Sequence, residues 1–150
     1  MRGQWLAAAL VTLGLGVAGC ASTTSAEAGA GPEGEAPPAQ VAEIPGKDVK
    51  SVTLSEHAAK RLGVETVELA AAPQGIAVPY SAVFYTPDGA AWVFTMTQPL
   101  TYVREKVTVA TVAGAKGDQA FLSEGPAVGT TVVKTGAIEL YGAEIGVSGE

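Results

Sequence analysis

Apolar and polar residues alternate along much of the chain after its N-terminal third, and this pattern predicts short β-strands. In residues 91–97, Trp92, Phe94 and Met96 fall on one side, and smaller or polar residues fall on the other. A two-residue period of this kind is typical of a strand with one side against a hydrophobic core. The preceding residues, 80–85, are rich in Tyr, Phe and Val, which also favour strands. We therefore expect two neighbouring strands, the second of which faces a core.

Residues 86–89, with the sequence Thr-Pro-Asp-Gly, predict the turn that joins these two strands. Proline presets the first corner of a type I turn, and glycine readily takes the positive φ that follows. Pro79 has no N–H group to donate to a neighbouring strand, so the first strand is expected to begin at Tyr80 or to lie at a sheet edge. The two strands and their turn form a predicted β-hairpin.

Residues 55–63 carry the end signals of a short α-helix. Ser55 suits the N-cap, and Gly63 suits the left-handed position after the last turn. Thr53 with Glu56 offers an alternative capping box two residues earlier. Because a helix of about two turns is not stable alone, it must pack on the sheet. The apolar residues expected to make that contact are spaced four apart: Leu54, Ala58 and Leu62.

Further apolar runs separated by glycine-containing turns predict the remaining strands. They occupy residues 49–54, 64–69, 101–112, 119–123 and 130–135. A bulge near residues 104–106 is expected to turn Glu105 outward. We expect residues 70–75 to be a loop, and Ile138 and Leu140 to continue the apolar pattern. The expected fold class is mainly β, a small antiparallel β-barrel or roll of about seven strands with one short α-helix.

The first residues of the chain have the features of a secretory signal peptide. Met1 and Arg2 provide a short positive segment, and residues 6–17 form an apolar run of Leu, Ala, Val and Gly. As a helix this run would be about 18 Å long, too short for a hydrocarbon core of about 30 Å. A signal peptide therefore fits better than a membrane-spanning helix.

Residues 17–20, Val-Ala-Gly-Cys, directly follow this run and resemble the lipobox of bacterial lipoproteins. In that family the cysteine is acylated and becomes the mature N-terminus after cleavage. The resemblance implies that residues 1–19 are a lipoprotein signal peptide and that Cys20 carries a lipid anchor. It places the protein at a cell membrane, extracytoplasmic, on the periplasmic face or the outer surface. An ordinary signal peptide followed by an unrelated cysteine is the alternative.

Residues 20–46 are predicted to be the acylated cysteine and a disordered linker, and the ordered β-domain is expected to span residues 47–150. The linker is mostly Ala, Gly, Glu, Pro, Ser and Thr, and it buries too little apolar surface to offset the entropy of ordering. The chain has 9 Lys and Arg against 15 Asp and Glu, and no basic run, so nucleic acid is not an expected partner. Cys20 is the sole cysteine, which excludes a disulfide framework.

Several short motifs occur in an order that is known from one family. They are residues 52–64, 78–83, 87–89, 92–94, 104–109, 124–129 and 132–136. Over roughly residues 49–142 the chain resembles the β-barrel and membrane-proximal parts of periplasmic adaptor proteins, the membrane fusion or haemolysin D-like subunits of efflux systems. The resemblance implies small antiparallel β-domains and a module that sits against an inner-membrane transporter or another envelope protein.

The chain departs from that family between Leu69 and Ile76. The adaptors carry a lipoyl-like domain, split around a long α-helical hairpin, between their barrel strands. Only a short loop is expected at this position here. The resemblance therefore implies an adaptor-like module that lacks the lipoyl and α-hairpin domains, and not a complete adaptor.

Residues with potential catalytic or metal-binding chemistry are few and scattered. His57 is the sole histidine, and a solvent-facing position on the short helix is the favoured interpretation. Ser81, His57 and Asp88 are the residue types of a hydrolytic triad, but no G-x-S-x-G elbow surrounds the serine. Asp88 and Asp118 stand beside turn glycines, and Met96 with His57 makes an incomplete copper site. We predict no enzyme, no catalytic residue, no cofactor and no metal site.

Large aromatic residues are the remaining candidates for a functional surface. Most should fill the core, but any that are exposed together would be anchors for a partner, because Tyr and Trp are enriched at the centres of interfaces. The predicted function is a lipid-anchored, non-enzymatic partner-binding module, accessory to an efflux or transport complex. The alternative is an extracytoplasmic lipoprotein that binds a small ligand or a metal. The candidate interface residues are Tyr80, Tyr85, Trp92, Tyr102 and Tyr141.

Overall fold

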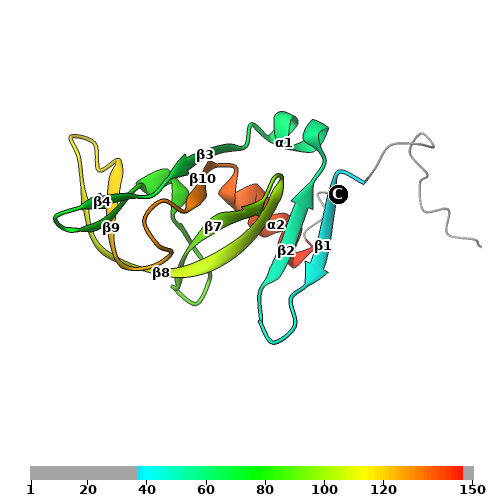
Figure 1. Ribbon diagram of the computed structural model, residues 1–150, viewed down its shortest axis with the longest axis horizontal. Helices are drawn as coiled ribbons and strands as arrows, with labels where there is room; N and C mark the ends of the chain where they lie inside the picture. The colour runs from blue at the N-terminus through cyan, green and yellow to red at the C-terminus, as the bar shows by residue number, and fades with distance from the viewer. Residues whose placement is uncertain (1–36, 147–150) are drawn as a thin grey trace, which may run out of the picture. The chain divides into compact units, whose positions relative to one another are not determined.

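The computed structural model describes residues 37–146, and this part of the chain is mainly β, as predicted (Figure 1). The predicted signal peptide, Cys20 and the linker up to residue 36 lie outside the described residues. The strands are β1 Ala39–Glu43, β2 Lys50–Leu54, β3 Glu65–Glu68, β4 Ala70–Ala72, β5 Gly75–Pro79, β6 Phe84–Tyr85, β7 Ala91–Gln98, β8 Thr101–Ala113, β9 Gln119–Glu124 and β10 Thr131–Thr135. The helices are α1 Glu56–Leu62, α2 Ala137–Ile145 and a 3-10 turn at Tyr80–Ala82.

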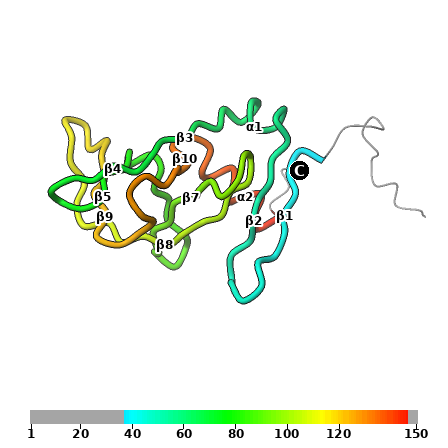
Figure 2. Tube along the Cα trace, in the orientation of Figure 1, coloured from blue at the N-terminus to red at the C-terminus, as the bar shows by residue number. Residues whose placement is uncertain are grey.

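The strands form one antiparallel sheet that curls back on itself. The order of paired strands is β3-β10-β7-β8-β9-β5-β4. Only Leu69 separates the first strand of this order from the last, and the trace in Figure 2 runs directly from β3 into β4. The N–H of Leu69 donates to the Thr130 carbonyl at 2.9 Å, and its carbonyl accepts from the Gly129 N–H at 2.8 Å. The sheet therefore begins and ends on one bent stretch of chain, as in a small barrel.

The predicted hairpin forms around the expected turn, but its first strand is short. The Gly89 N–H donates to the Thr86 carbonyl at 2.8 Å, and Gly89 has a φ of 82°. Phe84 pairs with Trp92 in the β6–β7 register. The first strand does not begin at Tyr80, because Tyr80–Ala82 form a 3-10 turn. The predicted loop at residues 70–75 is also wrong in part, since β4 and β5 pair there as a second hairpin.

The long strand β8 connects the parts of the sheet. It pairs with β2 through residues 101–103, with β7 through residues 101–107 and with β9 through residues 108–113. The bulge predicted at residues 104–106 is wrong, because the pairing with β7 is regular there, and the register shifts against β9 instead lie within residues 108–111. Glu105 reaches solvent without a bulge.

Strand β7 is buried on both sides, so the prediction of a single core face is incomplete. Phe94 packs with Val52 in one hydrophobic cluster, together with residues of α1 and α2. The next residue back, Val93, packs with Leu69 and Leu122 in a second cluster, the interior of the curled sheet. Both Val93 and Phe94 are fully buried. The additional cover on the Phe94 side comes from β2 and the two helices.

Helix α1 matches its prediction closely. The Ser55 hydroxyl accepts from the Ala58 N–H at 3.1 Å, and Gly63 ends the helix with a φ of 64°. The alternative capping box is not formed, since the Thr53 hydroxyl hydrogen-bonds that of Thr101 at 3.1 Å. Ala58 is buried against the sheet as expected, whereas Leu62 is exposed.

Strand β1 and helix α2 were also not predicted. Residues 39–43 were expected to be disordered linker, but they form β1 and pair with β2, with Val41 opposite Val52. This prediction is wrong because pairing with β2 satisfies backbone groups that composition alone leaves unpaired. The apolar pattern at Ile138 and Leu140 belongs to α2, a second helix, and not to a strand. Neither α-helix of residues 37–146 has the length and apolar character needed to cross a membrane.

Candidate interaction surfaces

Two of the candidate interface residues, Tyr80 and Tyr85, are exposed side by side. Their exposed fractions are 36% and 49%. Tyr80 lies in the 3-10 turn before β6, and Tyr85 ends β6, so the short strand brings both rings to one surface. A hydrogen bond with the Tyr80 side chain raises the pKa of Tyr85 above its usual value, with burial as a smaller cause. We call Tyr80 and Tyr85 the tyrosine pair.

A shallow groove of about 500 Å³ adjoins the tyrosine pair at Tyr85. Its charged lining groups are Asp88 in the hairpin turn and Lys106 on β8. The Thr86 hydroxyl donates to the Asp88 carboxylate and accepts from the Trp92 indole N–H at 3.0 Å. The bond from Thr86 is the main cause that lowers the pKa of Asp88, so this carboxylate is charged at neutral pH. The surface therefore combines aromatic rings with one charge of each sign.

The other three candidate interface residues are less exposed to solvent. Tyr102 is buried in the core, and loss of solvent raises the pKa of its hydroxyl, so its assignment to an interface was wrong. Trp92 and Tyr141 are half-buried and pack against the cluster that contains Phe84. The rings of Phe84 and Tyr141 have their centres 5.4 Å apart.

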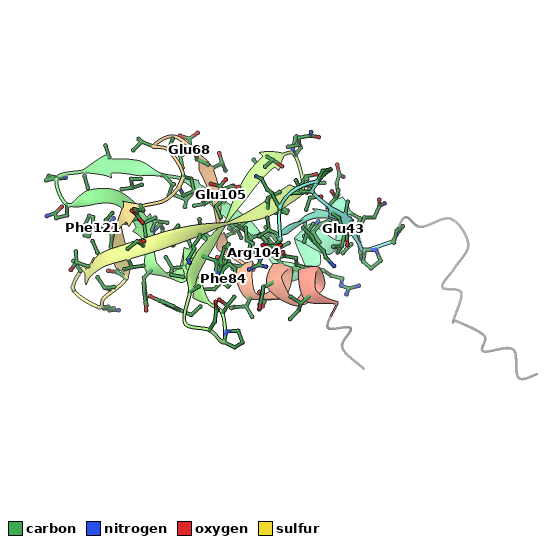
Figure 3. All side chains as sticks on the ribbon, turned by 90° about the horizontal axis from the view of Figure 1, so that it is seen from below. Glu43, Glu68, Phe84, Arg104, Glu105 and Phe121 are labelled. Carbon is green, nitrogen blue, oxygen red and sulfur yellow. The ribbon has the colours of Figure 1, made fainter. Side chains whose placement is uncertain are left out.

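Trp92 and Tyr141 instead flank a charged side chain. The Arg104 guanidinium carbon lies 4.3 Å from the centre of the Trp92 ring and 5.6 Å from that of Tyr141. Arg104 projects from β8 and lies beside α2, as Figure 3 shows. Its Nε atom is 2.9 Å from both carboxylate oxygens of Glu144 on α2. The side chains of Arg104 and Glu144 are only 14% and 2% exposed.

The Arg104–Glu144 pair holds α2 against the sheet. The Lys50 N–H at the start of β2 donates to Glu144 Oε1 at 3.0 Å, so one carboxylate connects α2 to both β8 and β2. Glu144 Oε2 has its ion pair with Arg104 but no well-directed hydrogen bond among the described residues. Sequence analysis missed this contact, because the two residues are forty positions apart and no local pattern joins them.

A second surface depression lies between α1 and α2. This groove of about 360 Å³ is mostly apolar, with Leu54, Ala58 and Leu62 on one wall. Gly142 and Ala143 line the α2 wall. The remaining lining residues are two at the start of β1 and two charged ones: Pro38, Ala39, Arg61 and Glu139.

The structure does not bring the potential catalytic residues together. His57 is exposed on α1, Ser81 lies in the 3-10 turn, and Asp88 bonds to its own hairpin. No hydrogen bond of the described residues joins these three side chains. Met96 is half-buried against the first hydrophobic cluster. Within residues 37–146 no three His, Cys, Asp or Glu side chains are grouped as a metal site would need.

Comparison of the chain with models of protein families, with curated proteins and with solved structures finds no match. The resemblance to periplasmic adaptor proteins stays a prediction from the order of short motifs.

Proposed function

We propose that this chain is a lipid-anchored, non-enzymatic module that binds a partner in the cell envelope through the tyrosine pair, as an accessory of an efflux or transport complex. The observation that carries the proposal is the exposure of Tyr80 and Tyr85 together on one surface. Tyr is enriched among the residues that dominate binding energy at interfaces. Asp88 and Lys106 beside them offer polar contacts at the rim.

The start of β1 supports a location close to the membrane. Eighteen residues, 21–38, separate Cys20 from Ala39, the first residue of β1, fewer than a linker reaching residue 46 would provide. If these residues are the flexible linker that their composition predicts, they would have a mean end-to-end distance of about 21–25 Å and a full extension of about 60 Å. With an acylated Cys20, the domain would stay within reach of the part of a membrane transporter that emerges from the bilayer.

The test is crosslinking of the full chain in intact membranes, followed by identification of the captured proteins. We expect one transporter or envelope protein to be recovered with the natural chain and to be lost with a Tyr80→Ala, Tyr85→Ala double variant. The reason is that the two rings supply the apolar centre of the contact. Val128→Ala, at another exposed apolar position, is the matched control and should capture the partner as the natural chain does.

Two results would contradict the proposal. Equal capture by the natural chain and the double variant would exclude the tyrosine pair as the contact. Recovery of no transporter or envelope protein, combined with a thermal shift on addition of a small ligand, copper or zinc, would favour the alternative of a ligand-binding lipoprotein.

A further inference from the structure

Helix α2 turns apolar residues outward, although it covers a core. Its buried residues are Ala137, Leu140 and Glu144, so one of the two charged side chains of the helix lies on the inner side, while Glu139 is exposed. On the outside, Ile138 and Ile145 are 60% and 53% exposed. The usual amphipathic pattern of a surface helix places apolar residues inside and charges outside. No packing contact within residues 37–146 explains why these two exposed positions of α2 are isoleucines.

Gly142 lies between these isoleucines on the outer side of α2. Positions 138, 142 and 145 are four and three residues apart, the spacing that brings side chains to one side of a helix. A Cβ atom added at Gly142 would meet nothing within 4 Å. Packing within the described residues therefore does not require glycine here, and glycine is unfavourable inside a helix relative to alanine. The space beside position 142 is open to an element from outside the described residues.

The outer side of α2 is complementary to itself. With a rise of 1.5 Å per residue, Ile138 lies about 6 Å before Gly142 along the axis, and Ile145 about 4.5 Å after it. In an antiparallel pair centred on Gly142, each isoleucine would lie within about 1.5 Å, along the axis, of the other isoleucine in the second copy. The adjoining groove carries one cation, Arg61, and one anion, Glu139, so two such surfaces do not repel each other.

We propose that α2 pairs antiparallel with α2 of a second copy of this chain, across a two-fold axis near Gly142. A two-fold interface uses the same patch on both copies, which is what a symmetric stripe of Ile138, Gly142 and Ile145 provides. The patch is small beside the roughly 800 Å² per partner of a stable interface. Association therefore depends on both copies being held at one surface by the lipid anchor of the proposed function, on which this inference rests, because the effective concentration is high there.

Disulfide crosslinking at the proposed axis tests the pairing. The full chain carrying Gly142→Cys would be oxidised by copper phenanthroline in intact membranes. Monomer and dimer would then be separated by gel electrophoresis without reductant. Two cysteines at the axis should give several-fold more dimer than Gln74→Cys, in the exposed turn between β4 and β5. The parent chain, whose sole cysteine is Cys20, measures the background.

A second pair of variants separates pairing from a failure to fold. Adding Ile138→Glu to Gly142→Cys should abolish the dimer, whereas adding Val128→Glu, at an exposed position outside α2, should leave it unchanged. Equal dimer yields for Gly142→Cys and Gln74→Cys would overturn the pairing. So would a Gly142→Cys chain that crosslinks only to a different protein, or one whose thiol is shielded by lipid without forming dimer. None of these results bears on the tyrosine pair, whose partner capture is measured separately.

Discussion

At the scale of single residues, the Arg104–Glu144 pair is the contact with the most consequence for α2. Glu144 is nearly inaccessible to water, and its carboxylate faces both Arg104 and the Lys50 N–H. Stacking on Trp92 and Tyr141 further orients the guanidinium. A buried charge is costly without its partner, so neither member of the pair can be removed alone without loss of stability.

We predict that Glu144→Gln lowers the free energy of unfolding by about 3 kcal/mol, because it leaves Arg104 without its counter-ion in a mostly buried site. Chemical denaturation followed by circular dichroism measures the change. Lys134→Gln is the matched control, since it breaks the Lys134–Glu65 pair, whose side chains are 40% and 61% exposed. An exposed pair contributes at most about 1 kcal/mol. Equal losses in the two variants would show that burial of Glu144 does not matter.

At the scale of elements, the stability of α1 depends on its N-cap, because the helix is too short to be stable alone. A seven-residue helix has little stability of its own, and the Ser55 hydroxyl satisfies an N–H of its first turn. Helix α2 has no side-chain cap and relies on Glu144 and Leu140 for its attachment. The two helices are thus fixed by different kinds of contact, a local one and a tertiary one.

Ser55→Ala should lower the free energy of unfolding by about 1 kcal/mol, because an N-cap hydroxyl is lost. A thermal unfolding curve of the full chain measures the effect. Ser123→Ala removes an exposed hydroxyl that bonds the Thr108 carbonyl at 3.3 Å, and it should change stability by less than about 0.5 kcal/mol. A larger loss with Ser123→Ala than with Ser55→Ala would contradict the assigned role of the cap.

At the scale of the whole described domain, two hydrophobic clusters share the strand β7. Phe94 belongs to the cluster beneath the helices, and Val93 belongs to the interior of the curled sheet. A strand that contributes to both makes it difficult to lose one cluster and keep the other. We therefore expect the domain to unfold in a single cooperative transition.

Leu69 joins the two ends of the sheet and is almost fully buried in the second cluster. Leu69→Ala should lower the free energy of unfolding by about 2–5 kcal/mol, the range for a cavity left in a packed core, while keeping one transition. Denaturant melts followed by tryptophan fluorescence and by circular dichroism check both points. Val112→Ala, at an exposed position on β8, is the control. Separate transitions in the two signals would show that the clusters unfold independently.

The sequence determined the elements whose signals are local. The Thr-Pro-Asp-Gly turn, the capped helix that starts after Ser55 and the presence of strands at β7 and β8 depend on residues a few positions apart, so each could be predicted. Exposure of Tyr80 with Tyr85 could be proposed but not decided, because which aromatic rings fill a core depends on the packing of distant strands.

Only the tertiary structure decided which segments distant in sequence form backbone hydrogen bonds or ion pairs with each other. Residues 39–43 become a strand because β2 offers them an edge, and Glu144 is tolerated inside because Arg104 reaches it from β8. The same packing leaves Ile138 and Ile145 facing outward, a feature that the apolar pattern alone would assign to the core. Local signals fix turns and caps because the interacting atoms are close along the chain. Burial and pairing are properties of the folded whole.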